Sequence, residues 1–387
     1  MKRRIAIIGA TQTKYEESKQ NLSLEELVWE VVEKVTSETG LTWADRISEG
    51  FGIDSIVSCS EDHWDARVIS SFCIQRELGA HQMPEIKVSG DSSKAVYLAV
   101  IQILSGKYDV VLVVSHRKES VTVRSIIENC GLDPIYVRPL GLDYSTTAAL
   151  QANRYMHKYG INEEEFAKVV VRSRMKGQNN PLAQPLPLVT VEDVLKSQVV
   201  AYPIKALDVK PISDGSSAMI LASEDKARKI CDKPIWIKGI GSCYDLHYPG
   251  DRDLSDCISL ELAARQAYRM AGIQQPSQDI DVAEISADYS YQELLWAEGL
   301  GFCERGNGGK LMDNKMIEIN CKTAINPSGG LLAGVPSGVA GMSRVAEAFL
   351  QIRGAATGRQ IEGARTALAH GVCGPCGQSH CVIILGS

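Results

Sequence analysis

The sequence predicts an α/β protein built from two similar halves, each a mostly parallel sheet covered by helices. A strand pattern followed by a helix pattern opens the chain, and the same order returns after residue 233. The two occurrences are separated by a constant offset of 232 residues. In addition, residues 108–115 (YDVVLVVS) form a nearly continuous β-branched run, which is typical of a strand buried on both faces.

The first occurrence begins with an expected strand over residues 4–8 and continues with an expected helix over residues 24–39. Ser23 is predicted to cap this helix, because Glu26 follows it at the spacing of a capping box. Gly40 is expected to end the helix.

The second occurrence has an expected strand over residues 235–240 and an expected helix over residues 258–270, which ends before Gly272. The offset aligns Gly9 with Gly241, Leu22 with Leu254, Ser23 with Ser255 and Ile53 with Ile285. Ser255 is therefore the expected cap of the second helix. Two unrelated α/β units with loops of ordinary length are the alternative interpretation.

The rest of the chain completes the two halves. Residues 380–385 (HCVIIL) are the expected counterpart of the strand at 108–115. Residues 117–209 hold a helix-rich insertion with several prolines, and such a long excursion is usually a lid or a substrate-binding element. We therefore predict an N-terminal half over residues 1–232, which carries the insertion, and a C-terminal half over residues 233–387.

Composition and charge exclude several classes of function. The 387 residues include 41 Lys and Arg and 47 Asp and Glu, and no basic block is present, so nucleic acid is not expected as a partner. No run approaches the roughly 18 apolar residues of a membrane span, and the apolar run after Met1 is too short for a signal peptide. The eleven cysteines, an odd number, are expected to be reduced thiols in a cytoplasmic protein.

Several segments resemble the thiolase superfamily, particularly the sterol-carrier-protein-type thiolases of bacteria and archaea. These segments are residues 148–166, 172–183 (RSRMKGQNNPLA), 208–227 (DVKPISDGSSAMILASEDKA), 299–309 (GLGFCERGNGG) and 326–341 (NPSGGLLAGVPSGVAG). The resemblance implies a five-layered αβαβα fold made of two similar halves. It also implies an acyl-coenzyme A substrate whose pantetheine arm enters a tunnel, with coenzyme A as substrate or product and no metal in this chain.

Two residues that the family needs for catalysis are replaced. The family's nucleophilic cysteine opens a helix, where the dipole lowers the thiol pKa, and the pattern Cys-x-Ser-Gly-x-x-Ala places Ser89 at that position. Val335 stands at the histidine position of the family's Gly-His-Pro element, which is expected to remain only as a helix start. Ser89 is a candidate nucleophile, although a hydroxyl without an adjacent base is a poor one.

The resemblance assigns other candidate catalytic residues to two segments. Asp288 is a candidate for proton transfer, and Tyr289 or Tyr291 for donation to an oxyanion; packing under the second sheet is the alternative for the tyrosines. In the C-terminal loop, Cys373 and Cys376 are candidate reactive thiols and His380 is a further candidate.

The same C-terminal loop contains Cys-Gly-Pro-Cys, the dithiol pattern of thioredoxins. A thioredoxin dithiol lies early in a small domain, whereas this one leads into the final strand, so a redox role is not favoured. A zinc site from this pair and His380 lacks a second pair of ligands.

Binding of coenzyme A is implied for six residues in two glycine- and asparagine-containing segments. They are Asn326, Ser328, Gly329, Gly330, Lys176 and Asn180.

We therefore expect an acyltransferase of thiolase type that cleaves or forms a carbon–carbon bond in a β-ketoacyl-CoA, with an atypical catalytic set. Similar branches are the benzoylsuccinyl-CoA thiolases of anaerobic aromatic degradation and the steroid side-chain aldolases, which pair with a small OB-fold, zinc-ribbon subunit. Retro-aldol cleavage of a β-hydroxyacyl-CoA and a non-catalytic subunit of a hetero-oligomeric complex are the alternatives. A homodimer is also implied by the resemblance.

Overall fold

The computed structural model describes residues 3–41, 52–312 and 321–387. Ten of the described strands form one sheet in the order β10-β9-β11-β12-β8-β1-β7-β4-β2-β3. Their bounds are β1 (Ile5–Gln12), β2 (Ser55–Cys59), β3 (Glu85–Val88), β4 (Val110–Lys118), β7 (Asp214–Ser223), β8 (Ile235–Tyr244), β9 (Val282–Ile285), β10 (Ala324–Ile325), β11 (Thr366–Cys373) and β12 (Ser379–Gly386). Strands β5 (Val199–Ala201) and β6 (Ile204–Lys205) form a separate hairpin.

The sheet repeats one topology twice. Read from its two edges, the order β3-β2-β4-β7-β1 matches the order β10-β9-β11-β12-β8. The two sets meet where Ala6 pairs with Trp236 and Ile7 pairs with Ile235. This repetition agrees with the predicted pair of similar halves. The predicted boundary at residue 232 lies between α7 (Glu224–Ile230) and β8, and as a domain boundary it stays a prediction.

Two details of the predicted sheet are wrong. The sheet is mixed rather than mostly parallel, because β7 and β12 run antiparallel to both of their neighbours. The counterpart of β4 is β11, and β12 corresponds to β7. Apolar runs show that a strand is buried on both faces, but they specify neither its direction nor its neighbours.

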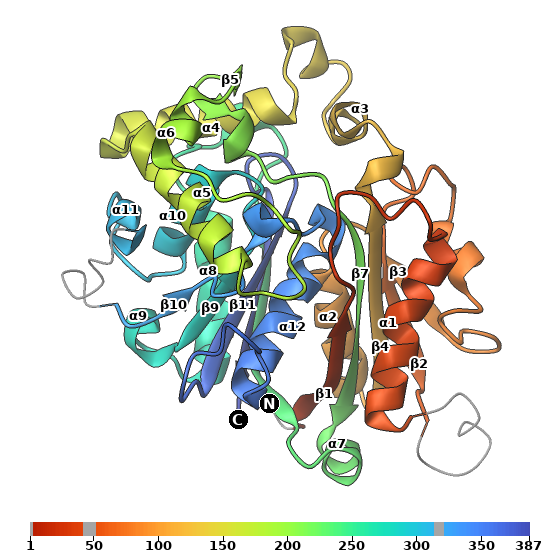
Figure 1. The fold of residues 1–387 in the computed structure, drawn as a ribbon. Coiled ribbons are helices and arrows are strands. Elements are labelled where there is room, and N and C mark those ends of the chain that lie inside the picture. Colours follow the sequence, from red (N-terminus) through yellow and green to blue (C-terminus); the bar gives the residue numbers. More distant parts are fainter. Residues whose placement is uncertain (1–2, 42–51, 313–320) are drawn as a thin grey trace.

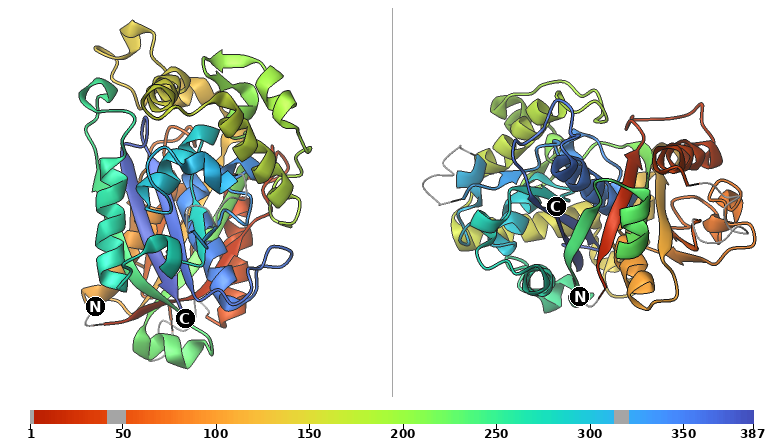
Figure 2. Two further views of the ribbon diagram at one scale, coloured as in Figure 1. Left: turned by 90° about the vertical axis from the view of Figure 1, so that its left-hand side faces the viewer. Right: turned by 90° about the horizontal axis from the view of Figure 1, so that it is seen from below.

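Three layers of helices enclose the two strand sets (Figures 1 and 2). Helix α1 (Leu24–Thr39) packs on the outer face of the N-terminal set, and α8 (Ile258–Ala271) and α10 (Ser290–Gly299) pack on the outer face of the C-terminal set. Between the sets, α2 (Ser93–Leu104) and α12 (Ala340–Arg353) share one apolar core with strands of both halves. The succession is the predicted five-layered αβαβα arrangement.

The helix ends test the predicted duplication. Ser23 accepts the Glu26 N–H at 3.2 Å and the Glu26 carboxylate accepts the Ser23 N–H at 2.8 Å, so the capping box is confirmed. Gly40 and Gly272 both end their helices in the left-handed conformation, with φ of 70° and 75°. Ser255, however, is not a cap, because its hydroxyl donates to Asp253 and α8 begins after Cys257.

The constant offset also fails beyond the first helix of each half. Ile285 ends β9, whereas Ile53 precedes β2 by two residues. The number of residues between α1 and β2 therefore differs from the number between α8 and β9, and the aligned positions drift apart.

The insertion between β4 and β7 begins above the N-terminal strands, and its later helices cover the C-terminal half (Figure 1). It contains α3 (Arg124–Asn129), α4 (Tyr144–Tyr159), α5 (Glu163–Gly177) and α6 (Val191–Lys196). Residues of α4 and α5, including Ala152 and Phe166, share a core with α8 and α10. The smaller helices of the C-terminal half are α9 (Pro276–Asp279) and α11 (Gly308–Met312). Among the described helices, none has the length and apolar character of a membrane span.

Close packing of α8 on β8 gives a testable prediction. A Cβ added at Gly241 would lie 2.0 Å from the Ala263 carbonyl oxygen, which belongs to the rigid backbone of α8. We expect Gly241→Ala to lower the free energy of unfolding by about 1–3 kcal/mol, as overpacking of a core does. Gly250→Ala is the matched control, because nothing lies within 4 Å of its added Cβ. Equal unfolding midpoints for the two variants in urea would contradict the packing argument.

Candidate active site

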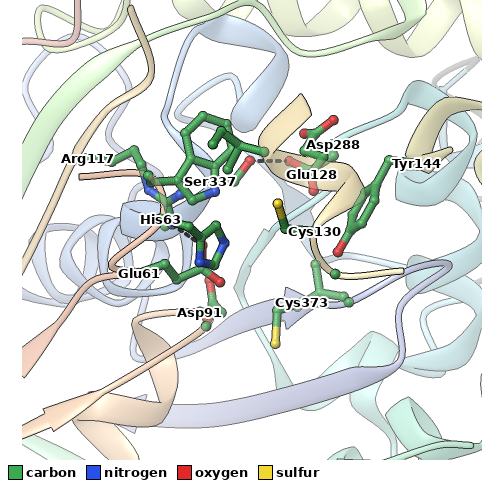
Figure 3. A pocket seen from close by; sticks show the side chains of 17 residues that line it. Glu61, His63, Asp91, Arg117, Glu128, Cys130, Tyr144, Asp288, Ser337 and Cys373 are labelled. Carbon is green, nitrogen blue, oxygen red and sulfur yellow. Dashed lines mark hydrogen bonds and ion pairs between the residues drawn. The ribbon is translucent and has the colours of Figure 1, made fainter. Parts of the chain in front are cut away.

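A cavity of about 260 Å³ lies at the carboxyl ends of the parallel strands, where α2 and α12 begin (Figure 3). In open α/β sheets this edge is the usual place for a ligand. The segments after β2, β3 and β9, the end of β4 and β11, and α3 and α4 of the insertion supply its walls. The polar side chains that line it belong to Glu61, His63, Asp91, Arg117, Glu128, Cys130, Tyr144, Asp288, Ser337 and Cys373.

Asp91 is the carboxylate on which two helices converge. It is buried and accepts, at 2.9 Å each, the N–H of Ser93 at the start of α2 and the N–H of Gly341 at the start of α12. Burial raises its pKa to about 6, although these N–H groups and the Ser93 hydroxyl oppose the shift. A group with this pKa is a base at neutral pH and can return a proton, as general acid–base catalysis requires.

Asp91 also restricts residue 371, which is a glycine near the end of β11. A Cβ at Gly371 would lie 2.0 Å from Asp91 Oδ1 and 2.1 Å from Ser93 Oγ. The carboxylate therefore occupies the space that a side chain at residue 371 would need.

Cys373, a candidate reactive thiol, lines the cavity, and its environment keeps the thiol protonated. Its Sγ is 3.4 Å from Lys94 Nζ, and the Lys94 ammonium lies 3.9 Å from the centre of the Tyr244 ring. Burial raises the pKa of Cys373 above its ordinary value, Asp91 adds to the shift, and Lys94 only partly opposes it. The thiol is therefore a weak nucleophile at neutral pH.

Tyr144 presents a proton donor to the cavity. It is the first residue of α4, after Asp143 caps that helix, and Figure 3 shows its hydroxyl pointing into the cavity from the side opposite Arg117. Burial raises the pKa of Tyr144 well above its ordinary value. The hydroxyl therefore remains protonated and can donate a hydrogen bond to a developing oxyanion.

Arg117, at the end of β4, is the buried cation of the site. Its Nη2 donates to Glu61 at 2.6 Å, and its guanidinium lies 4.6 Å from the centre of the Trp64 ring. Its Nε and Nη1 groups have no hydrogen-bond partner in the described part of the chain. Gly338 leaves the space for this side chain, since a Cβ there would lie 2.2 Å from Nη2.

Asp288, the other predicted residue at the cavity, accepts the Ser337 hydroxyl at 2.9 Å. Ser89 is not brought there, because it is exposed and α2 begins only at Ser93. Val335 lies in a small apolar cluster with Tyr15 and Leu331, ahead of the start of α12. The structure is thus consistent with the expectation that the segment around Val335 remains only as the start of a helix.

Tyr289 and Tyr291 are both buried and do not line the cavity. The Tyr291 hydroxyl donates to Gln151 at 2.8 Å, while the Tyr289 hydroxyl has no partner within the described ranges. Burial raises the pKa of both tyrosines. Helix α10 begins at Ser290, and both rings pack in the core, as the alternative interpretation proposed.

Cys376 and His380 also lie away from the cavity. The Cys376 thiol donates to the Thr147 carbonyl at 3.2 Å, and burial raises its pKa to about 12. His380 Nδ1 lies 2.9 Å from His370 Nε2, and both rings are fully buried. All eleven cysteines are free thiols, and among the described residues no group of three or more His, Cys, Asp or Glu is placed to hold a metal ion.

The six residues expected to bind coenzyme A have partners inside the protein. Asn326 accepts the Ile285 N–H at 2.6 Å, and Ser328 donates to Glu284 at 2.6 Å. Lys176, Asn180, Gly329 and Gly330 complete this junction between α5 and the ends of β9 and β10. None of the six lines the cavity, and their binding role stays a prediction.

The buried histidine pair predicts a pH dependence of stability. Burial lowers the pKa of His370 to about 3 and the pKa of His380 well below its ordinary value. Below pH ~6.5 the unfolded chain binds protons that the folded chain excludes, so stability falls by about 1.4 kcal/mol per pH unit and histidine. The loss begins near pH 6.5 and continues toward pH 3.

Urea unfolding between pH 7.5 and 4.5 measures this loss. The double variant His370→Gln/His380→Gln is expected to depend less steeply on pH than the wild type. His157→Gln, at an exposed position, is expected to keep the wild-type slope. A double variant with the wild-type slope would show that the pair does not cause the dependence.

A second cavity of about 640 Å³ adjoins the first and shares Glu128 and Tyr144 with it. It lies between α3, the start of α4 and the segment after β6. The insertion therefore forms part of the wall of the site and most of the lining of an adjacent cavity.

Sequence comparisons identify the origin of this arrangement. The family model described as "Thiolase, N-terminal domain" matches residues 5–225, and "Thiolase C-terminal domain-like" matches residues 243–387. An acetyl-CoA acetyltransferase of Methanothermobacter thermautotrophicus is 32% identical over 380 residues, which cover 96% of this chain and 97% of that protein. The benzoylsuccinyl-CoA thiolase subunit BbsB of Thauera aromatica is 31% identical over 59% of this chain and 60% of its own.

Solved structures share the fold. The Ltp2-ChsH2(DUF35) aldolase has a TM-score of 0.83 and 25% identity over 99% of this chain and 98% of that chain. Human mitochondrial 3-ketoacyl-CoA thiolase in complex with CoA has a TM-score of 0.73 and 16% identity over 100% and 98% of the two chains. These matches confirm the predicted fold and, as expected, relate the chain to enzymes of the acyltransferase class.

Proposed function

The chain belongs to the thiolase family, and from that premise we propose that it cleaves a β-hydroxyacyl-CoA by a retro-aldol reaction, or catalyses the reverse. The observation that carries the proposal is Asp91, a carboxylate with a pKa of about 6 at the junction of two helix N-termini. Cys373 in the same cavity is not an activated thiol, because burial raises its pKa. A carboxylate base beside a protonated thiol favours a reaction that proceeds by proton transfer and forms no acyl-enzyme.

In this reaction Asp91 takes the proton of the substrate's β-hydroxyl. The Cα–Cβ bond then breaks, the β-carbon leaves as an aldehyde or ketone, and the electron pair moves onto the thioester as an enolate. Asp91 returns the proton to Cα, which yields a shortened acyl-CoA and restores the carboxylate. Tyr144 donates a hydrogen bond to the enolate oxygen, where negative charge develops.

The adjacent cavity supplies a path for the pantetheine arm. Its volume of about 640 Å³ and its contact with the first cavity at Glu128 and Tyr144 support entry from the insertion side. A family structure is described as a complex with CoA, which supports coenzyme A as the carrier of the acyl group.

Thiolysis of a β-ketoacyl-CoA is the second candidate. One observation favours it: Cys373 lines the cavity with Lys94 3.4 Å from its sulfur, and an ammonium stabilises a thiolate. Against it, burial outweighs Lys94 and raises the thiol pKa. In that reaction Cys373 would accept an acyl group and pass it to free coenzyme A.

A small partner subunit is part of the proposal. The aldolase structure is described by two names, Ltp2 and ChsH2(DUF35), and the Thauera aromatica relative is named as a subunit. We propose that this chain likewise acts as a homodimer with a small OB-fold, zinc-ribbon subunit in the cytoplasm. A non-catalytic role in such a complex would leave the polar groups of the cavity without a use.

Product analysis separates these candidates. The chain, co-expressed with candidate partner subunits, is incubated with β-hydroxyacyl-CoA esters in the absence of free coenzyme A. We expect one shortened thioester and one aldehyde or ketone. Two thioesters, formed from β-ketoacyl-CoA only when coenzyme A is added, would establish thiolysis instead. No turnover with any partner, together with no CoA binding by calorimetry, would refute both.

A further inference from the structure

One wall of the catalytic cavity belongs to the loop of residues 61–69, which follows β2. Glu61, His63 and Trp64 of this loop line the cavity. Glu61 accepts from Arg117 at 2.6 Å, and the Trp64 ring centre lies 4.6 Å from the same guanidinium. Figure 3 shows Glu61 and Arg117 on one side of the cavity. The conformation of this 61–69 loop therefore contributes to the position of the buried cation of the site.

The 61–69 loop holds two residues in a strained backbone conformation. Ala66 and Ile69 have φ of 53° and 57°, in the left-handed region that glycine adopts most easily. Ile69 is β-branched, and a positive φ is an outlier for such a residue. Apolar burial does little to offset this strain, because Val68 is 88% exposed and Ile69 is 46% exposed. Strain of this kind persists only where surrounding contacts enforce it.

Three carboxylates of the 61–69 loop pair with basic side chains of β3 and β4, and the pair formed by His116 is the most buried. His116 Nε2 lies 3.1 Å from Asp65 Oδ2, and the two side chains are 1% and 2% exposed. The other two pairs are Glu61–Arg117 and Asp62–Lys87. Their carboxylates are partly exposed, and solvent weakens such pairs. His116 therefore provides the strongest anchor of the loop.

Asp65 depends on His116 for its charge. Burial raises the pKa of Asp65, but the hydrogen bond and the charge of His116 outweigh burial and hold this pKa below its ordinary value. Without His116, a buried carboxylate would lose its basic partner, which strongly disfavours the conformation that buries it. The strain at Ala66 and Ile69 would then favour release of the 61–69 loop.

We infer that His116 is a positioning residue for the proposed reaction, on which this inference rests: through Asp65 it holds the strained 61–69 loop against the cavity. His116 itself does not line the cavity. Asp91 is held separately by the N–H groups of α2 and α12, so loss of His116 leaves the base in place. Substrate binding is weakened instead, because the loop must then be ordered in each binding event.

Two substitutions of His116 separate its hydrogen bond from its volume. Leucine fills a similar volume without a donor, whereas the glutamine amide can donate to Asp65. For His116→Leu we expect trypsin cleavage after Arg67, inside the loop, to become about tenfold faster. KM for the β-hydroxyacyl-CoA is expected to rise about tenfold, with kcat within about twofold of the wild type. His116→Gln is expected to stay within about threefold of the wild type in both measurements.

Two further observations show whether His116 acts apart from the base. The fall of kcat/KM as the pH drops through about 6, which reports Asp91, is expected to persist in His116→Leu. His157→Leu, at an exposed position, is the matched control and is expected to keep the wild-type cleavage rate and KM. All measurements use the full chain, with its partner where one is found.

A substitution at residue 69 tests the strain itself. Ile69→Gly removes the penalty of a positive φ, so His116→Leu/Ile69→Gly is expected to recover about threefold of the protection and of the KM that His116→Leu loses. Asp65→Asn keeps the volume of the buried side chain and weakens the same bond. It is expected to change cleavage and KM in the direction of His116→Leu, and it tests the inference if His116→Leu does not fold.

A folded His116→Leu with the wild-type cleavage rate or the wild-type KM would overturn the inference. Faster cleavage at sites outside the loop to the same extent would also overturn it, because that result marks a general loss of stability. If the wild type turns over no β-hydroxyacyl-CoA with any partner, the proposed function is refuted. The cleavage rates would still decide whether His116 holds the 61–69 loop.

Discussion

Asp91→Asn is expected to lower kcat/KM for the β-hydroxyacyl-CoA by about 10²–10⁴-fold, the contribution of a general base. The amide cannot take the hydroxyl proton, although it keeps the size of the carboxylate. Steady-state release of the aldehyde or ketone measures the loss. Asp251→Asn, at an exposed turn, is the matched control and is expected to keep wild-type activity.

The pH profile strengthens this prediction. Because the base form is needed and the pKa of Asp91 is raised to about 6, wild-type kcat/KM is expected to fall as the pH drops through about 6. The residual activity of Asp91→Asn is expected not to fall in this pH range. Thermal unfolding shows whether the variant is folded. This control is needed because the side-chain amide nitrogen introduced at residue 91 cannot accept a hydrogen bond, and it faces one backbone N–H of α2 or α12. A folded variant with wild-type kcat/KM would remove Asp91 from the mechanism.

The second large effect concerns the ion pair beneath the site. Lys210 and Glu119 are fully buried, and both carboxylate oxygens accept from Lys210 Nζ at 2.8 Å. Glu119 also accepts the N–H of Ser337 at 3.0 Å, and Ser337 in turn donates to Asp288. Lys210→Met is expected to lower the free energy of unfolding by about 3–5 kcal/mol, because it leaves a buried carboxylate without its cation.

A double-mutant cycle isolates the pair. Lys210→Met/Glu119→Gln is expected to be less destabilised than the sum of the single variants, because the unpaired charge is absent. Lys196→Met is the matched control, since its pair with Glu192 is 73% exposed on both sides and is expected to contribute less than about 1 kcal/mol. Urea unfolding measures the wild type, the two single variants, the double variant and Lys196→Met. Equal losses for Lys210→Met and Lys196→Met would contradict the account of this pair.

The sequence was sufficient for the architecture because the signals of the fold are local. The capping box at Ser23 is set by neighbouring residues, and the glycines that end α1 and α8 recur at one spacing. Strand direction was not predictable, since β7 and β12 are buried along their whole length, as central parallel strands would be. Ser255 failed as a cap because Asp253, two residues earlier, takes its hydroxyl.

The site was predicted only in part, because its residues come together through tertiary contacts. Cys373 and Asp288 were found from family positions, and both line the cavity. Asp91 was overlooked, although an acidic residue just before a helix start is a local signal that could have identified it. Arg117 and Tyr144 gave no such signal, since only the folded insertion brings them to opposite sides of one cavity.

The buried candidates illustrate the same limit. Cys376 and Tyr291 have the right chemistry, but burial raises the pKa of each, and they lie in the core. His380 meets His370 across the β11–β12 pair, where neither ring is available to a substrate. Residue type indicated reactivity at these positions, and burial, which the sequence did not reveal, removes it.

Intact-mass analysis of the protein during turnover tests most directly the claim that the reaction needs no acyl-enzyme. The complex is mixed with a β-hydroxyacyl-CoA, quenched while the carbonyl product accumulates, and measured beside Cys373→Ala. The account predicts an unmodified mass for the wild type and carbonyl release by Cys373→Ala within about tenfold of the wild-type rate. An acyl group on Cys373 or Ser89 that disappears when coenzyme A is added would contradict it and establish thiolysis.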